Sequence, residues 1–219
     1  MDTISSIGIT VLDYFGNWKQ LHYHAKRFYA PVIVAGIRKT PENIEIQMVS
    51  DLQNTLQGEL TLSVRKISGE IRSERKLSVS IAASSVAVLE SIPIQEFADS
   101  PSENFLYLEF HGACSGVPVQ CANECFFAKY KEYQLPEPAI KSKIYRDSAG
   151  MTHLSLSTDK AAFYVFAEIK GIRGVFSDNS FTLLPDKPRD LTLRTDVELG
   201  LEELERALTI QHLRGSYED

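Results

Sequence analysis

In the run NIEIQMVS, residues 43–50, the apolar residues Ile44, Ile46 and Met48 alternate with the polar residues Glu45 and Gln47. A period of two residues is typical of a β-strand that buries one face. Residues 60–64 and 77–81 repeat the pattern, and Ser68-Gly69 between them predicts a hairpin turn. The centre of the chain is therefore predicted to be an antiparallel sheet structure.

Further strands are predicted on both sides of residue 120. Residues 86–92 and 105–111 complete a first set, and a second set follows at 124–131, 140–146, 151–157, 161–169, 180–184, 191–195 and 208–213. A hairpin turn is expected at 147–150 and a short helical excursion at 198–206. The connection 112–123, which is polar and contains cysteine, is the predicted domain boundary. This spacing of short strands predicts two antiparallel sandwiches.

One helix is predicted upstream of the strands, from about Asn17 to Ala30. Asn17 is the expected N-cap, and Pro31 is expected to end the helix. Apolar or aromatic residues recur at helical spacing, at Trp18, Leu21, His22, Ala25, Phe28 and Tyr29. An amphipathic helix of about 14 residues is only marginally stable alone in water. This apolar stripe is therefore expected to pack against the first sandwich or a second copy of the chain. Residues 1–12 are expected to be poorly ordered or paired elsewhere.

The composition is that of an ordinary globular chain. It has 219 residues, 43% hydrophobic and 24% charged, with a formal net charge of -6. The negative charge opposes binding to nucleic acid. No run approaches the roughly 18 to 20 apolar residues of a membrane span. The N-terminus lacks the basic and apolar regions of a secretory signal, which leaves the compartment of a longer parent open.

Three cysteines and a histidine lie close together in the sequence, at His111, Cys114, Cys121 and Cys125. A closed Cys3His zinc site usually has a pair of cysteines two to four residues apart and a second pair far along the chain. The spacing here therefore predicts no zinc. Two alternatives stay open: three reduced thiols, or one disulfide with one thiol left over.

Two motif blocks carry a family resemblance. The segment DYFGNWKQLHYHAKRFYAPV, residues 13–32, resembles the final barrel helix of β-mannosidases of glycoside hydrolase family 2. The run GVFSDNSF, residues 174–181, followed by Leu183-Leu184-Pro185, is similar to a recurrent motif of the terminal domain in that family. The likeness extends over most of the chain from Asp13 onward.

The resemblance implies an all-β chain whose sandwiches are both immunoglobulin-like. Residues 1–30 would be a remnant of a TIM-barrel catalytic domain, 31–113 a first sandwich and 114–219 the terminal one. The parent would hydrolyse terminal β-D-mannose with retention, and its barrel would be the partner of this region. The catalytic glutamates of the family lie upstream of anything present, so none is carried over. The first twelve residues depart from the family pattern, which usually has a tryptophan there; the sole tryptophan here is Trp18.

A few further residues are of types that could carry chemistry, namely Glu124, His22, His24, Asp178 and Asn179. A retaining glycosidase needs two carboxylates about 5 to 5.5 Å apart. Asn123-Glu124 mimics the acid/base dipeptide of the family but stands at a strand entry, so Glu124 is expected to be an ordinary residue at a strand edge. His22 and His24 point about 200° apart on a helix and cannot chelate one ion. Asp178 and Asn179 are expected to form an Asx-type turn. No catalytic, cofactor or metal residue is predicted.

Two tyrosines near the second set of strands are the candidate glycan contacts, Tyr130 and Tyr133. An exposed ring can stack on the apolar face of a pyranose, although most tyrosines at such places pack on a core. The chain is thus predicted to be a non-catalytic accessory region. The alternative is a stand-alone carbohydrate-binding or adhesion-like protein, and a homodimer through the helix is a further possibility.

Overall fold

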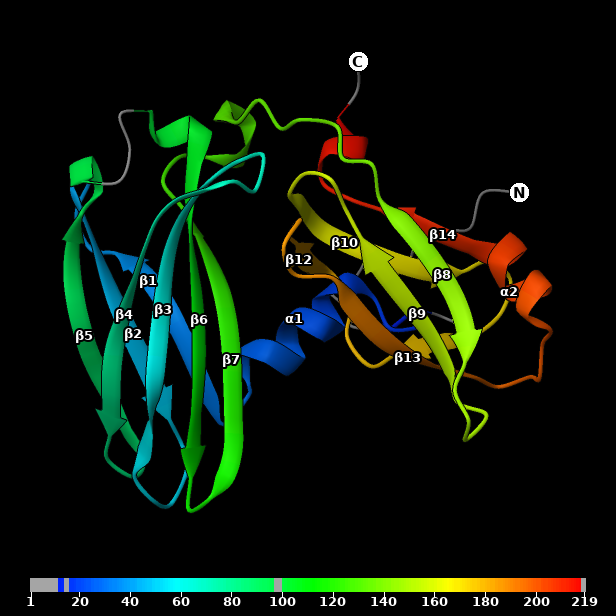
Figure 1. Ribbon diagram of the computed structural model, residues 1–219, viewed down its shortest axis with the longest axis horizontal. Coiled ribbons are helices and arrows are strands. Elements are labelled where there is room, and N and C mark those ends of the chain that lie inside the picture. Colours follow the sequence, from blue (N-terminus) through cyan, green and yellow to red (C-terminus); the bar gives the residue numbers. More distant parts are fainter. Residues whose placement is uncertain (1–11, 14–15, 97–99, 218–219) are drawn as a thin grey trace. The chain divides into compact units, whose positions relative to one another are not determined.

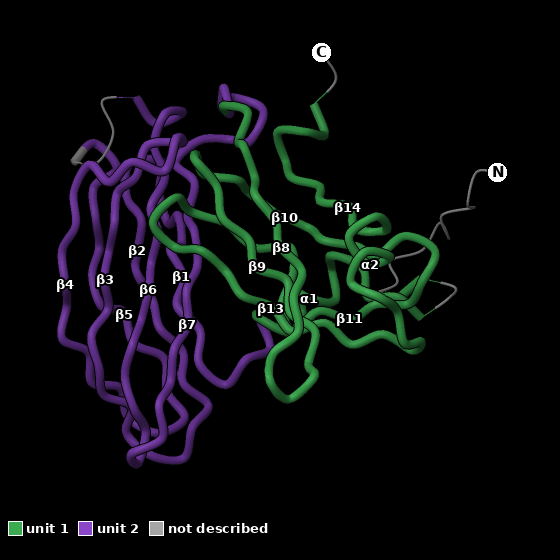
Figure 2. Tube along the Cα trace, turned by 45° about the vertical axis from the view of Figure 1, so that its right-hand side comes forward, with its two compact units in different colours: residues 1–27, 136–219 green, residues 28–135 purple. Residues whose placement is uncertain are grey.

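The chain folds into two compact units in a computed structural model that describes residues 12–13, 16–96 and 100–217. Unit 2 is continuous, from Phe28 to Leu135. Unit 1 combines the described residues up to Arg27 with those from Pro136 onward, so the two ends of the chain belong to the same unit (Figure 2). Each unit is described by itself below.

Unit 2 is a sandwich of two antiparallel sheets. Its strands are β1 (Val32–Arg38), β2 (Asn43–Ser50), β3 (Leu56–Lys66), β4 (Ile71–Ile81), β5 (Ser85–Pro93), β6 (Asn104–Cys114) and β7 (Val117–Phe126). One sheet has the order β1-β2-β5 and the other β4-β3-β6-β7. The ribbons of these strands run from blue to green in Figure 1.

The alternation that predicted the first strand also builds the core of unit 2. Ile44, Ile46 and Met48 of β2 are almost fully buried, while Glu45 and Gln47 between them are not. Burying one such side chain is worth roughly 1.5–3 kcal/mol. The predicted strands at 44–48, 60–64, 77–81, 86–92 and 105–111 are all confirmed.

The predicted domain boundary at 112–123 is wrong. These residues lie in β6 and β7, which pair in register from Phe105↔Phe126 to Cys114↔Val117. The turn between them contains Ser115 and Gly116, both with positive φ. Strand β7 is therefore the last strand of the first sandwich, and the units divide at Leu135/Pro136 rather than after residue 113. Of the segment 124–131, expected to be the first strand of the second sandwich, residues 124–126 end β7 and residues 127–131 lie outside any strand.

Unit 1 is a second pair of antiparallel sheets. Its strands are β8 (Lys141–Arg146), β9 (Thr152–Ser157), β10 (Ala162–Ile169), β11 (Gly174–Phe176), β12 (Phe181–Leu183), β13 (Arg189–Thr195) and β14 (Leu208–Gln211). The orders are β11-β13-β9-β8 and β12-β10-β14. The hairpin turn predicted at 147–150 joins β8 to β9, with the Gly150 N–H donating to the Asp147 carbonyl at 3.0 Å.

Two helices accompany the sheets of unit 1. Helix α2 (Leu201–Ala207) buries Leu204 in the core, and the Gly200 N–H donates to Glu203 Oε2 at its start (2.8 Å). Its position fits the predicted excursion at 198–206. Helix α1 (Gln20–Phe28) begins three residues after the predicted N-cap, because the Asn17 side chain donates to the Asp13 carboxylate (2.9 Å) rather than capping the helix. Neither helix, within the described residues, has the length and apolar character of a membrane span.

Candidate functional site

Helix α1 packs on unit 1 through Tyr23, its one buried residue. Tyr23 is 1% exposed, and its hydroxyl accepts a hydrogen bond from the Phe176 N–H at 3.3 Å. Its ring meets those of Trp18 (centroids 5.4 Å apart) and Phe166 of β10 (6.4 Å). Burial raises the pKa of Tyr23 above its ordinary value. The helix is thereby fixed to β10 and to the strand β11 that ends at Phe176.

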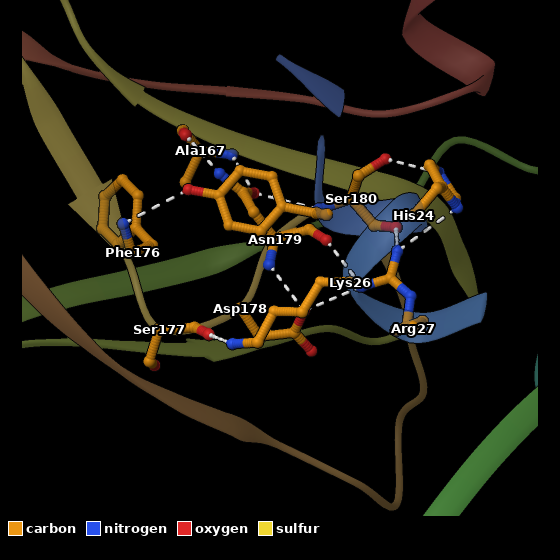
Figure 3. A network of polar contacts seen from close by, with 10 residues as sticks. His24, Lys26, Arg27, Ala167, Phe176, Ser177, Asp178, Asn179 and Ser180 are labelled. Carbon is orange, nitrogen blue, oxygen red and sulfur yellow. Dashed lines mark hydrogen bonds and ion pairs between the residues drawn. The ribbon is translucent and has the colours of Figure 1, made fainter. Parts of the chain in front are cut away.

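The segment that receives the helix runs from Ser177 to Ser180, and we call it the receiving turn. Asp178 Oδ1 accepts from the Asn179 N–H (2.9 Å), and Asn179 Oδ1 accepts from the Ser180 N–H (3.0 Å). Both bonds reach the N–H of the next residue, whereas an Asx-type turn bonds the N–H two positions on, so these contacts do not form the expected Asx-type turn. The turn presents its own carbonyl groups outward, and they become acceptors for α1 (Figure 3).

Arg27 is the main polar link between α1 and the receiving turn. Its Nη1 donates to Asp178 Oδ1 (2.7 Å) and to the Asn179 carbonyl (2.9 Å), and its Nη2 donates to the Ser180 carbonyl (2.6 Å). The guanidinium fork suits such convergent acceptors, and a charged donor makes the stronger kind of hydrogen bond. Lys26 Nζ adds a bond to the Ser177 carbonyl at 2.8 Å. Every residue of the turn is thus held by a basic residue of the last turn of α1, either directly or through its carbonyl.

His24 completes the contact between helix and turn. Its Nε2 lies 3.1 Å from Ser180 Oγ, and its Nδ1 lies 3.4 Å from Arg27 Nη2. Its ring meets the edge of the Tyr164 ring of β10 at 5.6 Å. Burial, and next the charge of Arg27, lower the pKa of His24 below its ordinary value.

The predicted apolar stripe of α1 does not form the contact. Leu21, Phe28 and Tyr29 are exposed, and the docked face is the one that carries Tyr23, His24 and Arg27. The face of α1 that docks on unit 1 is therefore not the stripe, and the expected packing of the stripe on the first sandwich or on a second copy of the chain stays a prediction. Residues 1–11 of the segment expected to be poorly ordered lie outside the described residues.

Of the two tyrosines predicted as glycan contacts, Tyr133 is buried. It is 3% exposed, and its hydroxyl accepts hydrogen bonds from the N–H groups of Phe127 (3.0 Å) and Ala128 (3.1 Å). The same oxygen lies 3.0 and 3.1 Å from the carbonyls of Asn104 and Pro101, one of which accepts its proton. Because its ring is enclosed, Tyr133 cannot stack on a sugar, and that prediction is corrected.

Tyr130 remains accessible. It is 45% exposed and packs edge-on against Phe126 of β7 at 4.8 Å between ring centroids. The two tyrosines, only three positions apart, therefore have different roles, and Tyr130 alone stays a candidate for a glycan contact.

The cysteines and His111 do not converge. His111 pairs with Gln120 on the outer face of the sheet, whereas Cys121 pairs with the buried Phe110 on the inner face. Cys121 and Cys125 are four residues apart on β7, roughly 13 Å along a strand, too far for a disulfide. Cys114, Cys121 and Cys125 are all free thiols. Among residues 12–13, 16–96 and 100–217, no three His, Cys, Asp or Glu side chains are grouped to hold a metal ion.

Glu124 lies on β7, the edge strand of its sheet, opposite Tyr107 of β6. The position matches the expected strand-edge residue. His22 and His24 likewise face different groups: His22 stacks on Trp18 with centroids 3.9 Å apart, and His24 faces the receiving turn.

A second polar cluster lies on the sheet β11-β13-β9-β8. His153 of β9 has Nδ1 2.7 Å from Asp190 Oδ1 and Nε2 3.2 Å from Asp147 Oδ2. Tyr145 stacks on the His153 ring at 5.0 Å and donates its hydroxyl to Asp190 Oδ2 at 2.6 Å. The hydrogen bond to Asp190 is the main cause that raises the pKa of His153. The two carboxylates lie on opposite sides of the ring, so the cluster ties the β8–β9 turn to β13.

Both units match family models of mannosidase domains. Residues 42–132 match a model described as a mannosidase Ig/CBM-like domain, and residues 135–216 match a model of mannosidase immunoglobulin domains described as an Ig-fold domain. The two matches meet where the units divide, between residues 132 and 136.

Curated relatives cover nearly the whole chain. The beta-mannosidase of Capra hircus is 27% identical over 211 residues, which are 94% of this chain and 24% of that protein. Beta-mannosidase A of Aspergillus terreus is 25% identical over 194 residues, 82% of this chain and 21% of that protein. The chain thus spans about a quarter of the length of the curated relatives that it matches.

Solved structures share the fold. A β-D-mannosidase from Dictyoglomus thermophilum superposes with a TM-score of 0.76 and 18% identity, covering 93% of this chain and 24% of that one. An exo-chitosanase from Amycolatopsis orientalis gives a TM-score of 0.60 and 14% identity, covering 95% of this chain and 28% of that one.

Proposed function

Because this chain belongs to the mannosidase immunoglobulin-like domain families through its two sandwiches, we propose that it forms a non-catalytic accessory region of a larger β-mannosidase of glycoside hydrolase family 2. The observation that carries the proposal is that both units match mannosidase domain models while the chain spans about a quarter of its relatives. The parent would hydrolyse terminal β-D-mannose with retention, and its barrel would be the partner of this region.

The docked helix supports a bracing role. Arg27, His24 and Tyr23 use their functional groups on the receiving turn and on Phe176, so their chemistry serves adhesion between helix and sandwich. A helix of nine residues is too short to be stable alone, and its docking supplies what propensity cannot. We propose that the terminal sandwich fixes α1 so that whatever precedes it in the chain is held in place.

Glu124 gives no support to catalysis by this chain. A retaining mechanism needs a second carboxylate about 5 to 5.5 Å away, and a cavity that holds the sugar between them. Glu124 instead lies on an edge strand opposite Tyr107. Its sequence likeness to a catalytic Asn-Glu pair is not accompanied by a matching position in the fold.

An activity assay tests the non-catalytic role. The purified 219-residue chain is expected to release no aryl group from aryl β-mannosides, and Glu124→Gln is expected to change nothing beyond a small effect on stability. Hydrolysis that follows the chain through several columns and disappears in Glu124→Gln would refute the proposal.

A second candidate function, carbohydrate binding, is favoured by two observations. Tyr130 offers an exposed ring supported by Phe126, and the model that matches this unit is described as Ig/CBM-like. A glycan array probed with the isolated chain separates the candidates. Micromolar binding that Tyr130→Ala removes would favour recognition, and silence favours the accessory role.

A further inference from the structure

The hydrogen bonds of His24 define its charge state in the docked helix. Arginine has donors only, so the Nδ1 that faces Arg27 Nη2 at 3.4 Å must act as the acceptor. The proton of the neutral ring then lies on Nε2, which donates to Ser180 Oγ at 3.1 Å. Docking therefore selects the neutral imidazole with its proton on Nε2.

The charged groups around His24 oppose a second proton. From α1 itself, Arg27 faces Nδ1 with its guanidinium. From the receiving turn, Asp178 contributes the opposite charge, but its Oδ1 already accepts from Arg27 at 2.7 Å. From β10, the Tyr164 ring is the neighbour. The burial of the ring and the Arg27 charge outweigh Asp178, and the pKa of His24 is lowered.

Two strained residues lie against the same ring. Ser180 has φ 52° and Tyr164 has φ 54°, in the left-handed region that is rare for side chains other than glycine. Tyr164 lies where the pairing of β10 with β12 shifts register. Such conformations persist only where surrounding contacts impose them. Both residues contact the His24 ring.

We propose that His24 is a pH-sensitive latch, whose protonation at Nδ1 releases α1 from the receiving turn. A proton on Nδ1 removes the acceptor for Arg27 and places two cations 3.4 Å apart. The docked state binds this proton less readily than the released state does, so docking is favoured above the ordinary histidine pKa and weakens as pH falls below it. The inference concerns this chain alone and goes beyond the accessory role, since it holds whether or not a barrel is present.

Trp18, the sole tryptophan, reports on docking because it contacts Tyr23. The experiment follows acrylamide quenching of Trp18, and hydrogen exchange of the α1 amides corrected for intrinsic rates, from pH 8 to pH 5. The His22 ring stacks on Trp18 with centroids 3.9 Å apart and can affect its fluorescence directly, so all proteins carry His22→Gln. In the His24 protein the docking equilibrium is expected to fall as pH decreases, by at most tenfold per pH unit, as one proton requires.

His24→Asn is the matched variant, since its carboxamide carries a donor and an acceptor but does not titrate. It is expected to keep α1 docked from pH 8 to pH 5. Equal pH dependence with and without His24→Asn, or none in the His24 protein, overturns the latch. A helix that is released at every pH would instead refute the docking and with it the bracing role. Should His24→Asn fail to fold, the His24 pKa measured by NMR decides, because a value at or above about 6.5 contradicts the latch.

Discussion

The side chain of Asn179 takes the place of a strand neighbour for Ala167. Its Oδ1 accepts from the Ala167 N–H and its Nδ2 donates to the Ala167 carbonyl, both at 2.8 Å. A carboxamide has the same donor and acceptor as a peptide group, so it can satisfy the N–H and C=O of Ala167 beyond the β10–β12 pair Val165↔Phe181. The receiving turn is anchored to β10 in this way, and the contacts of α1 depend on it.

Replacing Asn179 should therefore destabilise unit 1. Asn179→Ala leaves a buried N–H and a buried C=O of Ala167 without partners, at about 1–3 kcal/mol for each group. Urea unfolding should show a free energy of unfolding that is lower by that amount, and quenching of Trp18 should increase. Ser177→Ala, in the same turn, removes only one exposed hydrogen bond, which Ser177 Oγ accepts from the Thr192 N–H at 3.0 Å, and should cost less, about 0.5–1.5 kcal/mol. Equal stability of the two variants would contradict the anchoring role.

The bonds of Arg27 to carbonyl groups should contribute more than its ion pair. The Arg27 and Asp178 side chains are both about one-third exposed, and such pairs contribute about 0–1 kcal/mol. Arg27→Ala also removes the bonds to the Asn179 and Ser180 carbonyls, so it should weaken docking more than Asp178→Ala does. A double-mutant cycle read by Trp18 quenching at low and high salt checks this. If the two single variants were equal and both effects vanished in salt, the ion pair would dominate instead.

Loss of the hydroxyl group should destabilise the chain at Tyr133 but not at Tyr130. Tyr133→Phe removes an oxygen that bonds two buried N–H groups and a carbonyl, so it should lower the free energy of unfolding by about 1–3 kcal/mol. Tyr130→Phe, on the exposed ring, should be near neutral. Thermal or urea unfolding of both variants decides the matter. A neutral Tyr133→Phe would show that its hydroxyl is not structural.

The His153 cluster should make stability depend on pH. The folded pKa of His153 is raised by Asp190 first and Asp147 next, so its contribution is fully present below the ordinary histidine pKa of about 6.5 and is lost as pH rises through the folded value. The difference in urea midpoint between the parent chain and His153→Gln should accordingly be larger at pH 5.5 than at pH 8.5. A difference that grows with pH would have the wrong sign.

The thiols of β7 should be unreactive in the folded chain. Burial raises the pKa of Cys121 and of Cys125 to about 11, so both are protonated near pH 7. Labelling with a thiol reagent should be slow until denaturant is added, and elemental analysis should find no stoichiometric zinc. Rapid labelling of either cysteine, or one zinc per chain, would contradict this description.

The sequence predicts most strands correctly. It does not predict the pairing of residues 112–123 in β6 and β7, or which face of α1 docks on unit 1. The alternation at Ile44, Ile46 and Met48 predicts their burial directly, because a strand has only two faces. Residues 112–123 are polar and contain cysteine, a composition that favours a connection between two sets of strands. In the fold Cys121 and Cys125 pack against the core as small apolar side chains.

The docked face of α1 could not be predicted from the apolar period. That period favours the stripe of Leu21 and Phe28, whereas the partner of the helix is a turn rich in carbonyl acceptors. The group that binds these carbonyls is therefore a basic side chain, that of Arg27. The signal in the sequence was the Asp178-Asn179 pair, whose acceptors attract a guanidinium, but a separation of 151 residues hides the match.

The assignment of both ends of the chain to unit 1 has a consequence for synthesis. Arg27 leaves the ribosome 151 residues before Asp178, which at about 5–20 residues per second is a delay of roughly 8–30 s. During that interval unit 2, which is continuous from Phe28 to Leu135, can complete its own fold, while α1 has no acceptor to bind. We therefore expect unit 2 to fold first during synthesis and unit 1 to fold last. A pause in translation after Leu135 would lengthen the time during which α1 has no binding partner.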